Sequence, residues 1–190
     1  MSKLFIPVLE GTTRPGRRSI HAAKLITEIG NTLEDVEAEL VDPLDYNFPY
    51  DGNNKEVKDP RYTEITKKAD AFFIVTPEYN HSYPGTLKRM LDSELSNYIH
   101  KPVAFAGVSA QMWGGIRAIE ALAATVREMG MIAIFQDVQF PKAHKLFSEE
   151  GKLLDDTYIE RVEKVYEELI WMAKTLKYGR ENFQNKFHKS

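Results

Sequence analysis

Five short strand-like segments alternate with segments of helical periodicity, and this alternation limits the fold more than any other feature of the sequence. Four of them are apolar runs, at residues 4–9, 71–76, 103–108 and 131–135, and in the fifth, at residues 36–41, apolar and polar side chains alternate. Residues 19–30, 62–68, 86–99, 116–130 and 157–176 repeat apolar side chains at helical spacing. Continuous apolar runs are typical of strands that are buried on both faces. The pattern therefore predicts an α/β fold with a mostly parallel five-stranded sheet covered by helices on both faces. Pro7 is an awkward member of the first run, because proline cannot donate a hydrogen bond to a neighbouring strand.

The chain shows no linker, repeat or low-complexity tract, and its 190 residues suit one domain. We expect a single domain over residues 1–190, in which residues 155–190 form a C-terminal helix and tail. A net charge of −3 gives no reason to expect nucleic acid or an anionic membrane as a partner. No apolar run reaches the ~20 residues that a membrane helix needs. With no secretory signal and no cysteine, a cytoplasmic protein is expected.

Three loops follow the carboxyl ends of predicted strands and carry most of the candidate chemistry. The first loop is GTTRPGRRS (residues 11–19), the second is PEYNHSYPG (77–85) and the third is SAQMWGG (109–115). In open parallel sheets, ligands bind beyond the carboxyl ends of the strands. If the three loops converge, they line one site.

The first loop has the glycine spacing of a triphosphate-binding loop, but it lacks the lysine, the adjacent hydroxyl and the magnesium ligand that such a loop needs. Gly11 and Gly16 have the right spacing, yet Arg17 stands at the lysine position and Arg18 at the hydroxyl position. Ser19 comes one residue late, and no acidic residue ends a later strand where magnesium would need it. These departures argue against phosphoryl transfer.

A single terminal phosphate suits the first loop better. Thr13 stands where a dinucleotide fingerprint needs its second glycine, so a pyrophosphate is disfavoured. A helix N-terminus favours an anion, Thr12, Thr13 and Ser19 offer hydroxyls, and Arg14 offers a charged donor. The alternative is that Ser19 only caps the helix and the arginines form a solvated face.

The second loop combines two prolines with aromatic and amide side chains. Such groups, held rigidly beside a strand end, can stack on a flat heterocycle and hydrogen-bond its edge. The alternative is ordinary packing for Tyr79 and ordinary helix initiation for Pro84. His81 is expected to be a polar rim residue rather than a proton donor. His100, His144 and His188 lie outside the three loops and have no metal-ligand spacing.

Together, GTTRPGRRS, PEYNHSYPGTLKRMLD and SAQMWGGIRA resemble the NADPH-dependent FMN reductase family over residues 3 to 125. The part of this resemblance that is specific to the family is the pattern PEYN-x-S-x-PG-x-LK. The resemblance implies a flavodoxin-like three-layer sandwich with strand order 2-1-3-4-5, FMN as cofactor, and NADPH or NADH as co-substrate. It assigns the phosphate to the first loop, the isoalloxazine ring to the second loop, and a further flavin contact to the third. The implied FMN-binding residues are Thr12, Arg14, Ser19, His21, Pro77, Glu78, Tyr79, Asn80, Ser109, Gly114 and Gly115.

The resemblance also implies a reaction in which hydride passes from nicotinamide to the flavin N5 and on to a small acceptor. That acceptor is a quinone, an azo compound, a metal oxyanion or free flavin, and no side chain is nominated as catalytic acid or base. Two other readings stay open: a flavodoxin-type FMN electron carrier, and a flavin-free scaffold on the same fold.

The family's usual assembly implies a homodimer or homotetramer. Mild support for an oligomer comes from six large apolar side chains, more than one sheet needs to cover it: Leu91, Leu95, Tyr98, Trp113, Ile116 and Trp171. The alternative is that these side chains pack the core. The roles of Arg17 and Arg18 are also open. They grip the FMN phosphate, or they meet the phosphate of an incoming NADPH.

Overall fold

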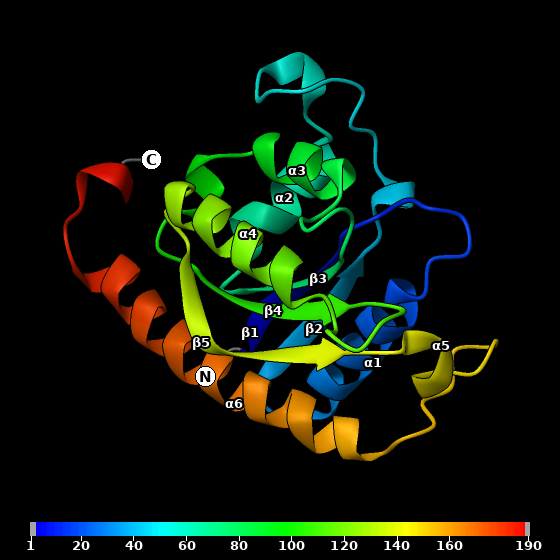
Figure 1. The fold of residues 1–190 in the computed structure, drawn as a ribbon. Helices are drawn as coiled ribbons and strands as arrows, with labels where there is room; N and C mark the ends of the chain where they lie inside the picture. Colours follow the sequence, from blue (N-terminus) through cyan, green and yellow to red (C-terminus); the bar gives the residue numbers. More distant parts are fainter. Residues whose placement is uncertain (1–2, 189–190) are drawn as a thin grey trace.

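The computed structural model describes residues 3–188 and consists of a five-stranded sheet between two layers of helices (Figure 1). Residues 1–2 and 189–190 lie outside the described part, so the expected extent of the domain and its tail is not described at those ends. The strands are β1 (Leu4–Glu10), β2 (Val36–Val41), β3 (Phe72–Pro77), β4 (Pro102–Val108) and β5 (Ile132–Phe140). The α-helices are α1 (Ser19–Thr32), α2 (Pro60–Lys68), α3 (Gly85–Asp92), α4 (Ile116–Glu128), α5 (Ala143–Leu146) and α6 (Thr157–Asn182). Four short 3-10 turns complete the described elements: Pro43–Asp45, Lys55–Val57, Ser96–Tyr98 and Lys186–His188.

The sheet has the order β2-β1-β3-β4-β5 and every pairing is parallel. This confirms the expected flavodoxin-like arrangement. All five carboxyl ends therefore lie at one edge of the sheet, together with the three loops. No helix within residues 3–188 is both long and apolar enough to span a bilayer.

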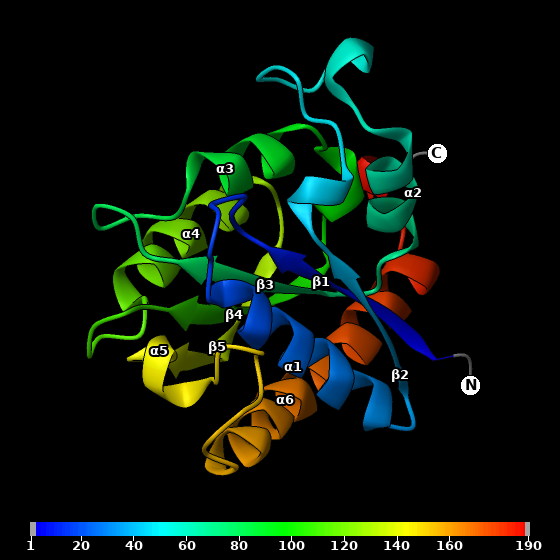
Figure 2. The same cartoon turned by 90° about the vertical axis from the view of Figure 1, so that its right-hand side faces the viewer.

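A separate apolar core fills each face of the sheet. Helices α1 and α6 cover one face, and α2, α3 and α4 cover the other (Figures 1 and 2). Side chains of β1 alternate between the two cores: Ile6 and Val8 pack towards α1 and α6, whereas Phe5 and Leu9 pack towards α2 and α3. This burial on both faces explains why β1 reads as a continuous apolar run.

Pro7 sits in an interior strand without breaking the sheet. The backbone of Phe5 faces β3, because Phe5 accepts a hydrogen bond from the backbone N–H of Asp70 and donates one to the Asp70 carboxylate. Alternate residues of a strand face the same neighbour, so Pro7 also faces β3. The regular β1–β3 pairing begins only at Val8, after the residue that lacks a donor. The strand thus places its missing N–H where no ladder bond is required.

The predicted end of the fifth strand, at residue 135, is wrong. β5 continues to Phe140 after an irregularity: Val103 pairs with Ala133, but Phe105 pairs with Asp137. The extra residues bulge and leave Phe135 exposed. As an edge strand with one solvated side, the remaining QDVQF carries polar residues that do not form an apolar run. The extension carries the chain to the same edge as the three loops.

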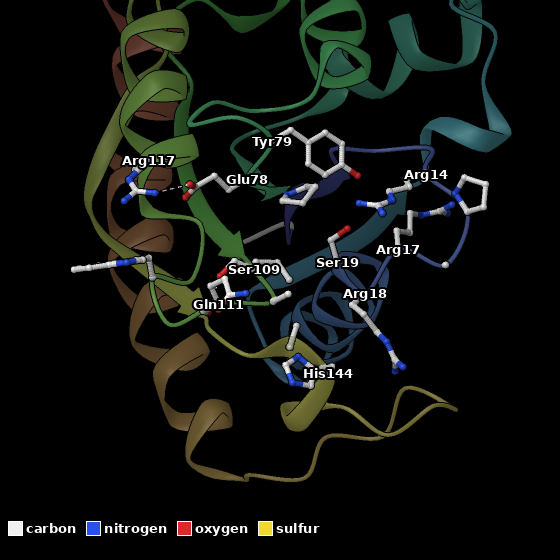
Figure 3. A pocket seen from close by; sticks show the side chains of 17 residues that line it. Arg14, Arg17, Arg18, Ser19, Glu78, Tyr79, Ser109, Gln111, Arg117 and His144 are labelled. Carbon is white, nitrogen blue, oxygen red and sulfur yellow. Dashed lines mark hydrogen bonds and ion pairs between the residues drawn. The ribbon is translucent and has the colours of Figure 1, made fainter.

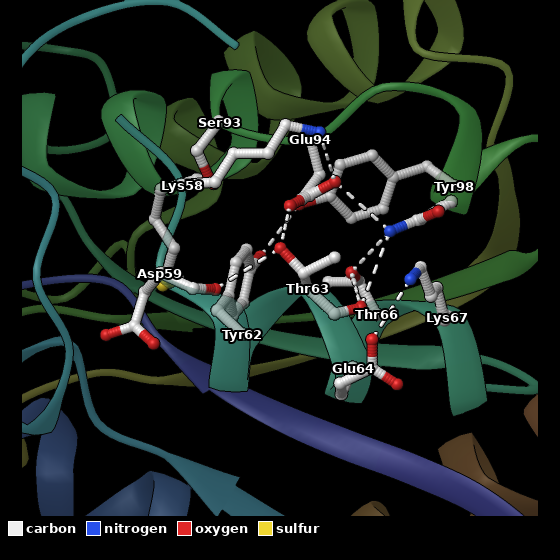
Figure 4. Close-up of polar contacts among 12 residues, drawn as sticks. Lys58, Asp59, Tyr62, Thr63, Glu64, Thr66, Lys67, Ser93, Glu94 and Tyr98 are labelled. Carbon is white, nitrogen blue, oxygen red and sulfur yellow. Dashed lines mark hydrogen bonds and ion pairs between the residues drawn. The ribbon is translucent and has the colours of Figure 1, made fainter. Parts of the chain in front are cut away.

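The predicted helix over residues 86–99 is too long, because α3 ends at Asp92. Beyond it, Glu94 turns inward and is almost fully buried. Its carboxylate accepts hydrogen bonds from Lys58 at 2.9 Å, from Asn97 at 3.1 Å and from the Thr63 hydroxyl (Figure 4). This network joins the segment after α3 to α2. At the C-terminus, α6 runs six residues past its predicted end at residue 176, to Asn182.

Candidate functional site

The three loops converge at the carboxyl edge of the sheet around a pocket of about 480 Å³ (Figure 3). This volume lies within the range of small-molecule sites. The residues that line it come from all three loops, from the start of α4 and from α5: Arg14, Pro15, Gly16, Arg17, Arg18, Ser19, Pro77, Glu78, Tyr79, Val108, Ser109, Ala110, Gln111, Trp113, Arg117, Ala143 and His144.

In the first loop, Ser19 is the first residue of α1 and does not cap it. Arg18 occupies the N-cap position, and its side chain makes no capping hydrogen bond. The Ser19 hydroxyl instead lies 2.5 Å from Oε1 of Glu10, at the end of β1. The backbone N–H groups at the start of α1 therefore have no side-chain cap, and the partial positive charge of the helix faces the pocket.

The three arginines of the first loop have different partners. Arg17 is mostly buried, forms an ion pair with Asp42, and places its Nε 3.8 Å from Glu10. Arg18 donates to the backbone carbonyl of Ser148 at 3.0 Å. Arg14 has no carboxylate partner within residues 3–188. Arg17 therefore balances the carboxylate of Asp42, whereas Arg14 is the guanidinium available to an anion in the pocket.

Glu10 is a fully buried carboxyl directly behind the pocket. Burial raises the pKa of Glu10 from 4.5 to about 8, against the lowering effects of the Ser19 hydrogen bond and of Arg17. At neutral pH the side chain is therefore mostly protonated. The burial of Glu10 can be read from the sequence, because Glu10 directly follows the apolar run 4–9 and a residue that continues a strand buried on both faces is buried too.

The second loop forms a tight turn that positions Tyr79. The backbones of Tyr79 and Ser82 exchange hydrogen bonds of 2.8 and 3.0 Å, and both intervening residues, Asn80 and His81, have positive φ. A two-residue turn of this kind needs left-handed backbone, which asparagine tolerates better than most residues. Asn80 is exposed and serves the turn, while Tyr79 reaches the pocket.

Tyr79 connects the second loop to the first. Its hydroxyl lies 3.1 Å from the hydroxyl of Thr12, and the Arg14 guanidinium lies 5.9 Å from the centre of its ring. The Thr12 hydroxyl also accepts a hydrogen bond from the backbone N–H of Arg14 at 3.2 Å. Thr12 therefore lies behind the pocket wall, where it fixes the path of the first loop.

Glu78 connects the second loop to α4. Its Oε1 accepts a hydrogen bond from Arg117 at 3.1 Å, and its backbone N–H donates to the carbonyl of Val108 at 3.3 Å. The other carboxylate oxygen, Oε2, is buried without a partner. Such an acceptor at a pocket wall is available to an N–H of a ligand.

The third loop depends on two glycines that pack against the sheet. Gly114 and Gly115 have φ values of +60° and +84°, and a Cβ on Gly114 would lie 2.5 Å from the Cβ of Gln139. Neither glycine lines the pocket. Their close packing presents Ser109, whose hydroxyl donates to the carbonyl of Gln111 at 2.8 Å, and Gln111 itself.

Of the expected FMN-binding residues, the structure brings six to the pocket surface: Arg14, Ser19, Pro77, Glu78, Tyr79 and Ser109. Thr12, Asn80, Gly114 and Gly115 support the same loops without lining the pocket. His21 points elsewhere: its ring packs 5.9 Å from that of Phe147 and lies against Gly151. Burial lowers the pKa of His21, helped by Arg18 and Lys24.

Sequence reasoning misses His144, Arg117 and Trp113 as pocket residues. It places His144 outside the site because it ends β5 five residues early. Once β5 reaches Phe140, the residues after it must lie at the carboxyl edge, and α5 brings His144 to the pocket. Arg117 belongs to the first turn of α4, directly after the third loop. This position in the chain is the signal from which its place at the pocket could have been predicted.

The polar groups of this region fit a phosphorylated ring compound such as FMN. Within the described residues, the buried side-chain atoms without a hydrogen-bond partner are Glu10 Oε2, Arg17 Nε and Glu78 Oε2. All three belong to residues that line the pocket or lie directly behind it. A helix N-terminus and Arg14 mark an anion-binding end, and the second and third loops form the remaining wall. Fold and site together define a flavodoxin-like protein with a small-molecule pocket at the carboxyl edge of its sheet.

Comparison with known proteins identifies the family. Residues 6–145 match the model of the NADPH-dependent FMN reductase family. The NADPH azoreductase of a Bacillus strain is 30% identical over 154 residues, covering 78% of this chain and 82% of that protein. An NAD(P)H-dependent FMN reductase of Pseudomonas aeruginosa is 30% identical over 176 residues, covering 87% of this chain and 94% of the relative. The chain therefore belongs to the NADPH-dependent FMN reductase family.

The solved structures agree on the fold. The flavoenzyme NAD(P)H:(acceptor) oxidoreductase FerB of Paracoccus denitrificans superimposes with a TM-score of 0.71 at 21% identity, covering 90% of this chain and 98% of its own. Family and fold confirm the expected class of FMN-dependent NAD(P)H oxidoreductase. Among the three readings that the sequence left open, they favour the oxidoreductase over an electron carrier or a scaffold.

Proposed function

We propose that this protein is a cytoplasmic oxidoreductase that holds FMN in the pocket of the three loops and passes electrons from NAD(P)H to a small acceptor. The observation that carries the proposal is the convergence on one pocket of an uncapped helix N-terminus, the Arg14 guanidinium, which has no carboxylate partner in residues 3–188, and the unpartnered buried Oε2 of Glu78. Residues 1–190 act in it as a single FMN-binding domain.

The phosphate belongs at the start of α1. Backbone N–H groups there are not satisfied by a side-chain cap, and Arg14 has no carboxylate partner in the described part of the chain. Ser19 adds a hydroxyl from the first helical turn. This set gives one positive side chain, a helix dipole and neutral donors, which suits a single phosphate better than a metal-bound triphosphate.

The isoalloxazine ring belongs between the second and third loops. Tyr79, Pro77 and Glu78 form one side of that space, and Ser109 and Gln111 form the other. The buried Glu78 Oε2 offers an acceptor to a ring N–H, and Arg117 keeps the carboxylate in place. Thr12, Asn80, Gly114 and Gly115 hold the loops in position, and His21 acts only through the packing of α1 against the segment around Gly151.

The chemistry that bound FMN supplies is acceptance of a hydride from nicotinamide and its delivery to the acceptor. The chain contributes orientation and electrostatics, and no side chain is needed as acid or base. Arg117 contributes to this orientation through its ion pair with Glu78 beside the ring space. Met112 and Trp113 stand exposed at the rim, where a nicotinamide or a flat acceptor such as a quinone or an azo compound can stack.

Exposed apolar side chains support assembly as a homodimer or homotetramer. Leu91 and Tyr98 are buried in the core, but Leu95, Trp113 and Trp171 are exposed, at 50%, 59% and 60% of their full accessibility. Large exposed aromatic residues are enriched at subunit interfaces. Light scattering coupled to gel filtration gives the mass: twice or four times 21.8 kDa is expected, and a monomer would contradict this part of the proposal.

The placement of the phosphate is tested by flavin binding. Arg14→Ala should weaken FMN binding about tenfold, the loss of one charge-assisted contact, and leave riboflavin binding unchanged because riboflavin has no phosphate. Lys88→Ala is a matched control, since Lys88 is an exposed cation paired with Asp92 on α3 and does not line this pocket. Equal loss of FMN and riboflavin would place the phosphate elsewhere.

A further inference from the structure

A buried carboxyl group and a hydroxyl lie in line behind the phosphate end of the pocket. Oε1 of Glu10 is 2.5 Å from Oγ of Ser19, and Glu10 is completely inaccessible to solvent. Ser19 lines the pocket from the first turn of α1, as Figure 3 shows. The other Glu10 oxygen, Oε2, has no hydrogen-bond partner.

The charge state of Glu10 decides where the Ser19 hydrogen points. A carboxylate only accepts hydrogen bonds, so an ionised Glu10 requires Ser19 to donate to it. A protonated Glu10 can donate to Ser19 Oγ, which leaves the Ser19 hydrogen free to point into the pocket. Only in the second state is Ser19 a donor for a phosphate.

The surroundings favour the protonated state. The charged groups that face Glu10 are Arg17 from the first loop and Asp42 from the end of β2; α1 contributes the Ser19 hydroxyl, and β3 places Val75 beside it. Burial raises the pKa of Glu10 by more than Ser19, Arg17 and the backbone N–H of Thr12 lower it. Arg17 lies 3.8 Å from Oε1, too far for a hydrogen bond, and its charge is shared with Asp42. An unpartnered Oε2 is costly on a carboxylate and much less so on a neutral acid.

We propose that Glu10 is a proton-carrying positioning residue for the FMN phosphate. Protonated Glu10 donates to Ser19 Oγ, and the Ser19 hydroxyl in turn donates to the phosphate. Ionised Glu10 takes that hydrogen for itself and adds a negative charge behind the phosphate. This inference rests on the proposed placement of the phosphate at the start of α1.

The proton balance follows from this chain of donors. When FMN binds a protein in which Glu10 is ionised, one proton moves from solvent to Oε1 of Glu10, and the Ser19 hydrogen turns from Glu10 to the phosphate. When Glu10 is already protonated, no proton is taken up. Because the pKa of Glu10 without FMN is about 8, FMN binding should become proton-linked above that pH.

The first test compares the wild type with Glu10→Gln. For the wild type, the dissociation constant of FMN should rise about tenfold between about pH 7 and about pH 9, the factor that a single ionisation near pH 8 gives. The amide that replaces the carboxyl in the variant cannot ionise but can still donate to Ser19, so the variant should bind FMN about equally at both pH values. A wild-type constant that does not change, or an equal rise in the variant, would overturn the proposal.

The second test needs no variant. Calorimetric titration of the apoprotein with FMN, in buffers of different ionisation enthalpy, counts the protons taken up on binding. The count should rise from near zero at about pH 7 to nearly one at about pH 9. No uptake at either pH would overturn the role of Glu10 even if Glu10→Gln fails to fold.

Riboflavin separates this inference from the proposed site. If riboflavin binds as tightly as FMN at about pH 7, the phosphate placement itself fails. If FMN binds much more tightly than riboflavin but without any pH dependence, the site stands and only the role of Glu10 is rejected.

Discussion

The hydroxyl of Tyr79 lies 3.1 Å from that of Thr12, and this contact joins the loop after β3 to the loop after β1. The centre of the Tyr79 ring also lies 5.9 Å from the Arg14 guanidinium. One side chain thus couples the end of the pocket proposed for the phosphate to the end proposed for the ring. Thr12 is itself fixed by the backbone N–H of Arg14.

Tyr79→Phe should therefore weaken FMN binding by about threefold to tenfold, because it removes one hydrogen bond that holds the two loops together. Tyr83→Phe is the matched control: its hydroxyl lies 2.7 Å from that of Thr125, away from the pocket. Fluorescence titration with FMN measures both. Equal weakening by the two variants would contradict a specific role for the Tyr79 contact.

Arg17→Ala should lower the free energy of unfolding by about 3 kcal/mol, because it leaves the Asp42 carboxylate without its largely buried cation. Arg14→Ala should change it by less than about 0.5 kcal/mol, since Arg14 is exposed and has no carboxylate partner in residues 3–188. Urea unfolding of the apoproteins measures both values. The opposite ranking would show that Arg14, not Arg17, is the structural arginine of the first loop.

Glu94→Gln should lower the free energy of unfolding by about 1–3 kcal/mol. The substitution removes the ion pair with Lys58 and one strong acceptor from the buried network of Figure 4, and the Glu94 side chain is only 3% exposed. Glu64→Gln, which breaks an exposed pair with Lys67 within helix α2, should cost less than about 0.5 kcal/mol. Similar costs for the two variants would mean that the network adds nothing beyond a surface ion pair.

The stability of the apoprotein should also depend on the protonation of Glu10. Its pKa is raised on folding from 4.5 to about 8, so the folded chain binds more protons than the unfolded chain between these values. The contribution of Glu10 is therefore fully present below about pH 4.5 and is lost as the pH rises towards 8. Thermal unfolding should show Glu10→Gln gaining stability relative to the wild type from about pH 5 to about pH 8. A constant difference across this range would contradict a raised pKa.

Much of the fold follows from the sequence because each face of the sheet is buried. Interior strands such as 103–108 read as apolar runs because both of their faces are buried, whereas the edge strand 36–41 reads as an alternation of apolar and polar residues. Helices such as α1 begin where a loop ends. The full length of the edge strand β5 cannot be predicted from the sequence, since the solvated residues after its bulge resemble a loop. The end of α3 is also missed, because the burial of Glu94 depends on partners such as Lys58, 36 residues away.

The site is predictable in outline and not in its internal pairing. Arg14, Ser19 and Tyr79 come from loops whose position at the carboxyl edge follows from a parallel sheet. That Arg17 pairs with Asp42 cannot be read from the sequence, because the two residues are brought together only by the β1–β2 pairing. The position of His144 at the pocket can be predicted only when β5 is known to continue to Phe140.

The proposed function is tested most directly by loading the purified protein with FMN and adding NADPH or NADH without oxygen. The yellow absorbance of the flavin should be lost without any partner protein and should return when a quinone or azo dye is added. Protein-bound flavin that stays oxidised with both nicotinamides would contradict it.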